Sequence, residues 1–162
     1  MSDSSLNKEA IKAVDYKRLK VSSTAFQDEG MIPSKYTCDG RNINPPLDIK
    51  QIPEEAKCMV LIVDDPDAPL GIWVHWLVWN IPVTHHLKEN EVHGTEGMND
   101  FRQHHYGGPC PPSGTHRYFF KVYALDTLLE LPASTKKIQL EKAMSEHIIA
   151  FGELIGLYRR NN

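Results

Sequence analysis

Two short apolar segments, "CMVLIVDD" (58–65) and "WVHWLVWNI" (73–81), flank a turn rich in proline and glycine, "PDAPLG". Both segments are short and rich in β-branched and aromatic residues, so they predict β-strands. The first is apolar without alternation from Cys58 to Val63, which is typical of a central strand covered on both faces. A third strand is predicted at "HRYFFKVYALD" (116–126). The sequence therefore predicts a mainly β, β-rich α+β fold.

The carboxylates that end the first strand raise a question of their own. Asp64, Asp65 and Asp67 follow a buried segment directly, and burying an unpartnered carboxylate is costly. They either lie on a solvated turn, accepting local backbone N–H bonds, or they serve a site. Both interpretations stay open at this point.

Two histidines open the next two predicted strands, and each follows a proline-rich turn. Strict alternation places His75 on one face with Trp73, Leu77, Trp79 and Ile81, and His116 on one face with Tyr118, Phe120, Val122 and Ala124. If the strands are close in one sheet, both imidazoles emerge at a common end beside Asp65 and Asp67. Such a group suits a small anion, above all a phosphate monoester. Taken singly, each histidine could instead be a satisfied core residue.

Other segments add less to the argument. Residues 1–20 are predicted to be a helical or loose N-terminal extension packed at an edge, and residues 21–162 a single domain. A helix is predicted at 135–148, whereas periodicity leaves the final "IIAFGELIGLYRR" (148–160) open between helix and strand.

Composition excludes several classes of function. A net charge of -3 with no basic stripe argues against nucleic-acid binding. No apolar run approaches the roughly 20 residues that span a bilayer, and the N-terminus lacks the apolar core of a secretory signal, which indicates the cytoplasm. Three cysteines in such a chain favour reduced thiols, with a Cys38–Cys110 bridge left open. Asp65, His75, His116 and Cys110 could in principle hold zinc, but no ligand spacing supports it, so no metal and no cofactor are expected.

The segments "VDDPDAP", "WVHW" and "YGGPCPPSGTHRYFFKVYAL" together resemble the phosphatidylethanolamine-binding protein family, in its bacterial and archaeal Raf-kinase-inhibitor-like branch. The resemblance implies a central antiparallel Greek-key sheet, a second small sheet and few peripheral helices. It also implies a terminal strand at "AFGELIGLY" and a cis Ala68–Pro69 bond. Carried over by motif, the anion pocket consists of Asp65 with Asp67 in support, His75, Pro112, His116 and Tyr118.

The function predicted first is non-enzymatic binding of a phosphate-bearing small ligand of the phosphoethanolamine or phospholipid head-group type. A second hypothesis is a regulator that binds a protein partner, such as a protease or a kinase, through the loops around the pocket. A hydrolase that uses Cys110 or a histidine-activated water is the third, and no motif for an activated nucleophile supports it. The oligomeric state is not readable from the sequence, and a homodimer stays open.

Overall fold

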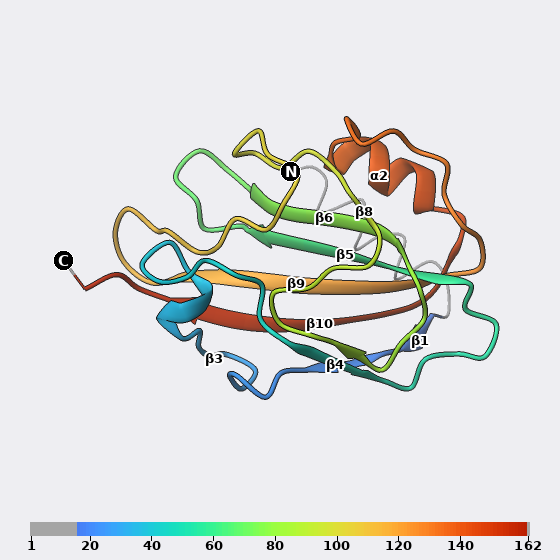
Figure 1. Cartoon of the computed structure of the whole chain (residues 1–162), viewed down its shortest axis with the longest axis horizontal. Helices are drawn as coiled ribbons and strands as arrows, with labels where there is room; N and C mark the ends of the chain where they lie inside the picture. Colours follow the sequence, from blue (N-terminus) through green and yellow to red (C-terminus); the bar gives the residue numbers. More distant parts are fainter. Residues whose placement is uncertain (1–15, 162) are drawn as a thin grey trace.

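The computed structural model describes residues 16–161 and contains two β-sheets (Figure 1). A seven-stranded sheet has the order β1-β10-β9-β5-β6-β8, with β3 also paired to β10, and a three-stranded sheet has the order β2-β4-β7. In chain order the elements are β1 (Lys17–Arg18), β2 (Lys20–Ser22), β3 (Gly30–Met31), the 3-10 helix η1 (Ser34–Tyr36), β4 (Leu47–Lys50), β5 (Cys58–Asp65), β6 (Trp73–Ile81), β7 (His86–Leu87), β8 (Thr95–Glu96), β9 (His116–Leu125), α2 (Lys137–Met144) and β10 (Ile148–Tyr158).

The large sheet lies between the small sheet and α2, and each face has its own core (Figure 1). On one face, Leu47 and Ile49 of the small sheet belong to a buried cluster with Leu61 and Val122. On the other face, the α2 side chains pack against Val60, Ile62 and Tyr123. Burial of apolar side chains on both faces explains why β5 is apolar without alternation and is buried along its whole length.

The position of β5 brings the two histidine-bearing strands to one end of the sheet. Strand β5 pairs with β6 on one side and with β9 on the other, antiparallel in both cases. Strands β6 and β9 therefore run in the same direction, and both begin where β5 ends. This arrangement confirms that the turn after β5 and the loop before β9 lie at a common end.

Most expectations about the elements are confirmed. The fold is β-rich, its central strands are antiparallel, and the segment after α2 is the strand β10. The short edge strands β1 and β3 pair with β10 in parallel, so the large sheet as a whole is mixed. The helix is shorter than predicted, because α2 begins at Lys137 and ends at Met144, residues 145–147 form a turn, and Ile148 begins β10. No helix within 16–161 has the length and apolar character needed to span a membrane.

The expected N-terminal extension is described only in part, because residues 1–15 lie outside the described range. At its end, Lys17–Arg18 forms β1 on the edge of the large sheet, and Lys20 begins β2. The domain start at residue 21 stays a prediction.

Strict alternation along β6 is wrong, because its pairing with β5 is irregular at two places. Val63 is opposite Trp76 and Asp64 is opposite Val74, so His75 is an extra residue in a β-bulge. A second irregularity includes Asn80, whose φ of 55° is left-handed. As a result Trp76, Val78 and Ile81 join the core under the small sheet, whereas Val74, Leu77 and Trp79 join the core under α2. Alternation does hold on β9.

Helix α2 offers a matched test of the second core. Leu140 is 0% exposed and Ile138, on the same helix, is 63% exposed. We expect Leu140→Ala to lower the free energy of unfolding by about 2–5 kcal/mol, through lost burial and an unfilled cavity. Ile138→Ala is expected to change it by less than about 0.5 kcal/mol. Urea unfolding followed by tryptophan fluorescence measures both, and equal effects would contradict the placement of α2.

Candidate functional site

A cavity of about 230 Å³ opens at the common end of β5, β6 and β9. The turn after β5 and the proline-rich loop before β9 supply two of its walls. Its lining residues are Asp65, Ala68, Pro69, Trp73, His75, Phe101, Cys110, Pro111, Pro112, His116 and Tyr118.

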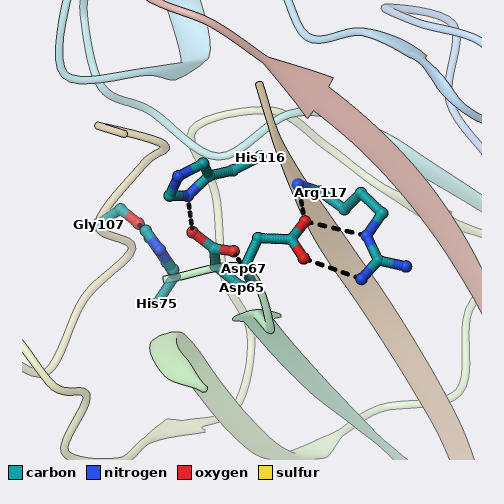
Figure 2. A network of polar contacts seen from close by, with 6 residues as sticks. All are labelled: Asp65, Asp67, His75, Gly107, His116 and Arg117. Carbon is teal, nitrogen blue, oxygen red and sulfur yellow. Dashed lines mark hydrogen bonds and ion pairs between the residues drawn. The ribbon is translucent and has the colours of Figure 1, made fainter. Parts of the chain in front are cut away.

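Asp65 is the buried carboxylate of this cavity, and its oxygens are well supplied with donors. One oxygen accepts a 2.7 Å hydrogen bond from the backbone N–H of Asp67. The other is 2.7 Å from Nδ1 of His116 (Figure 2). Since a carboxylate oxygen only accepts, Nδ1 of His116 carries the proton. These bonds compensate the burial of the carboxylate and hold the His116 ring in one orientation.

His75 is held by the backbone of the loop that follows β8. Its Nδ1 is 2.6 Å from the carbonyl oxygen of Gly107, which only accepts, so this nitrogen is also the protonated one (Figure 2). The Gly107 N–H and the Asn99 side chain both donate to the His75 carbonyl oxygen. Burial lowers the pKa of His75 below its ordinary value of 6.5. The ring is therefore neutral near pH 7, and its Nε2 then carries a lone pair.

Aromatic rings enclose the two imidazoles. Tyr118 packs edge-on against His75 at 5.3 Å between ring centroids and stacks on His116 at 6.4 Å. Phe101 contacts His75 edge-on at 5.2 Å and Trp73 at 5.5 Å. Burial raises the pKa of Tyr118 well above its usual range, so its hydroxyl stays protonated as a donor. The cavity therefore combines apolar walls with a few polar groups, as small-ligand sites do.

Asp67 does not line the cavity. Its carboxylate is turned away from the imidazoles and forms a two-pronged ion pair with Arg117, with both N···O distances at 2.9 Å (Figure 2). It also accepts from the Arg117 backbone N–H at 2.9 Å. The bond with Arg117 lowers the pKa of Asp67. Asp67 thus ties the turn after β5 to the start of β9, which is a supporting position.

Asp64 points to the opposite face of the large sheet. There its carboxylate lies 2.9 Å from Nζ of Lys137 on α2 and 3.2 Å from Nζ of Lys121 on β9. All three side chains are almost entirely buried. Removing Asp64 would leave two largely buried ammonium groups without this carboxylate, so the cluster attaches the end of β5 to β9 and α2.

The proline-rich loop is anchored by a disulfide between Cys38 and Cys110. The expectation of reduced thiols is therefore wrong for these two cysteines, and Cys58 alone is free among the described cysteines. The bridge forms because the segment after η1 lies against the loop, where the Cys38 N–H donates to the Pro109 carbonyl at 3.1 Å. On a chain-entropy basis, a bridge across 72 residues contributes about 4 kcal/mol to stability.

The expected cis bond between Ala68 and Pro69 is also wrong, since residues 16–161 contain no cis peptide. The chain reverses by another route. The Gly71 N–H donates to the Ala68 carbonyl at 3.1 Å, and Gly71 has a φ of 118° that glycine tolerates.

Five of the six predicted site residues meet at one cavity, namely Asp65, His75, Pro112, His116 and Tyr118. The sequence reasoning missed Phe101, which lies in a stretch without a recognisable pattern. It also missed the role of the Gly107 carbonyl, although Gly107 lies within the quoted segment "YGGPCPPSGTHRYFFKVYAL". It further missed the ion pair between Arg117 and Asp67, although Arg117 stands next to His116 in the sequence. Within the described part of the chain, no group of three or more His, Cys, Asp or Glu side chains could hold a metal ion.

The sequence profile of the family described as "Phosphatidylethanolamine-binding protein" matches residues 22–159, which include all of these residues. The chain belongs to this family.

Similar members of the phosphatidylethanolamine-binding protein family occur in archaea and bacteria. A UPF0098 protein of Pyrococcus abyssi is 52% identical over 153 residues, which cover 88% of this chain and 85% of the relative. A crystal structure of a phosphatidylethanolamine-binding protein homologue from Chlamydia trachomatis has a TM-score of 0.86 and 41% identity, covering 90% of this chain and 99% of the other. Escherichia coli YbcL, described as a member of the mammalian family, has a TM-score of 0.82 and 29% identity, covering 89% and 99%.

The lowered pKa of His75 predicts how stability depends on pH. The unfolded chain binds a proton at this histidine more readily than the folded chain does, so acid favours unfolding. The contribution is fully present above the unfolded pKa of about 6.5 and is lost as pH falls through the lower folded pKa. As the pH is lowered from about 7.5 to about 5, we expect the urea concentration at the unfolding midpoint to decrease. The decrease should be smaller in His75→Asn.

The control is His104→Asn, which removes an exposed imidazole and should keep the wild-type pH dependence. A His75→Asn profile parallel to that of the wild type would contradict the assignment.

Proposed function

We propose that this protein binds a small phosphate-bearing ligand, of the phosphoethanolamine or phospholipid head-group type, without catalysing a reaction. Membership of the family supports binding of ligands or partners in general. The observation that carries the finer proposal is the convergence of His75 and His116 on one cavity with Asp65.

The positions of the imidazole protons indicate that binding of the anion requires one further proton, either on an imidazole ring or on the phosphate itself. Nδ1 of each imidazole is occupied by a protein acceptor, Gly107 for His75 and Asp65 for His116. The free nitrogen is then Nε2, which donates to phosphate only when the ring is protonated. Alternatively, a phosphate monoanion donates its own O–H to a neutral Nε2, since the second phosphate pKa is about 6. Both routes make binding weaker as pH rises.

We propose no catalytic step because the candidate nucleophile, Cys110, is not a free thiol. Cys110 lines the cavity but is half of a disulfide, so it is not a thiolate. Asp65 and His116 form a pair that could orient a water, but no serine, threonine or free cysteine lies among the lining residues. A cytoplasmic location is a further part of the proposal, although the disulfide removes the thiol argument for it.

Calorimetric titration with O-phosphoethanolamine tests the proposal. We expect the affinity to be highest near pH 5.5 and lowest near pH 8.5, because the phosphate, whose second pKa is about 6, loses over this range the proton that a neutral Nε2 accepts. His75→Asn and His116→Asn should each weaken binding about 10- to 100-fold, which is the value of a charged hydrogen bond. Ethanolamine and His104→Asn are the controls. Heats that neither variant changes would overturn the proposal.

Binding of a protein partner is the second candidate, and exposed apolar side chains around the cavity favour it. Leu70, at the tip of the turn after β5, is 101% exposed, and Trp73 and Phe101 at the cavity wall are 37% and 38% exposed. If this is the function, proteins captured by the immobilised chain should be lost with Leu70→Ser and kept with His116→Asn. If capture is instead kept with Leu70→Ser and lost with His116→Asn, the result favours phosphate binding in the pocket as the function.

A further inference from the structure

A second cavity, of about 260 Å³, lies between the two sheets. Its floor is apolar and comes from both sheets, with Leu47 of β4, Leu61 of β5, Val78 of β6 and Phe120 of β9 all buried. Leu87 and Val92 close its sides and are partly exposed. An unfilled apolar cavity lowers stability in proportion to its volume, so a site of this size and lining is suited to an apolar ligand.

This second cavity is separate from the histidine site. The two share no lining residue. Tyr118 and Phe120 are on the same face of β9, Tyr118 in the first cavity and Phe120 in the second. The two rings are neighbours on one face, but each encloses its own space.

The rim of the second cavity is polar and contains Asn44, Thr84, His86, Lys88, Glu91 and His93. Two of these side chains have polar partners, because His86 lies 2.7 Å from Asp48 and the Glu91 carboxylate lies 3.8 Å from His93. Within residues 16–161, no carboxylate lies within ion-pair distance of the exposed Lys88 ammonium. The rim thus offers the Lys88 ammonium above an apolar interior, while its one carboxylate, Glu91, faces His93.

We propose that this cavity binds an amphipathic anion, a carboxylate with a single short acyl chain. The acyl chain occupies the space between the sheets, and the carboxylate pairs with Lys88. The volume limits the length of the chain. A water takes about 30 Å³ of liquid volume, so the cavity corresponds to roughly eight or nine atoms of that size. Octanoate matches this length.

Calorimetric titration with octanoate is the test, with acetate and 1-octanol as ligands that lack the tail or the charge. Val92→Phe fills the cavity from its side and should weaken octanoate binding at least tenfold. Val83→Phe, at an exposed residue outside the lining, should change it less than twofold. Lys88→Gln should lower the affinity for octanoate about two- to fivefold, which is the value of an exposed ion pair. It should leave the affinity for 1-octanol unchanged. Lys50→Gln, an exposed lysine on β4 outside the lining, is its control.

Position is measured directly, which keeps the test valid even if Val92→Phe does not fold. Nuclear Overhauser contacts should join the octanoate methylenes to the methyl groups of Leu47 and Val78. O-phosphoethanolamine should not displace octanoate, and its own affinity should be the same in Val92→Phe, so failure of one site is distinguishable from failure of the other. Absence of saturable binding at millimolar octanoate, or contacts elsewhere on the chain, would overturn the proposal. Equal loss of octanoate and octanol in Lys88→Gln would overturn the choice of an anion.

Discussion

Two consecutive buried carboxylates at the end of β5 organise this structure. In an extended strand, neighbouring side chains point to opposite faces of the sheet, so Asp64 and Asp65 cannot share partners. On one face, Asp65 accepts hydrogen bonds from His116 and from the backbone N–H of Asp67. On the other face, Asp64 forms ion pairs with Lys137 and Lys121. Each carboxylate is compensated where it is buried, as the cost of burying a charge requires. The cavity and the α2 layer are therefore attached to the same strand end.

The β-bulge at His75 is the second constraint on the site. A regular β6 would alternate past Asp64 and Asp65 and send residue 75 to the α2 face with Leu77 and Trp79. The extra residue turns His75 toward Tyr118 instead, where the Gly107 carbonyl holds its ring. Bulges next to binding sites commonly redirect a side chain in this way. The local departure from regular pairing is thus what completes the pair of imidazoles.

Several features could be predicted because they depend on local pattern. The apolar run of β5, the alternation of β9 and the aromatic and β-branched content of both indicate strands whatever their neighbours are. The pairing of His75 with His116 followed from the positions of both at strand starts after proline-rich turns. Features that depend on distant contacts could not be obtained this way. Cys38 and Cys110 are 72 residues apart, and nothing between them signals that the segment after η1 packs against the proline-rich loop.

The sequence by itself determined the β-rich class and the central place of β5, because these follow from hydrophobic periodicity. It placed the acidic and imidazole groups at one end of the sheet only on the condition that β6 and β9 lie close together, which the pairing of both with β5 supplies. Only the tertiary structure decided which partner each carboxylate binds. Asp65, Asp67 and Asp64 are alike in sequence, yet they pair with His116, Arg117 and Lys137 respectively. That assignment depends on the register between β5 and β9, since a shift of one residue moves a side chain to the other face.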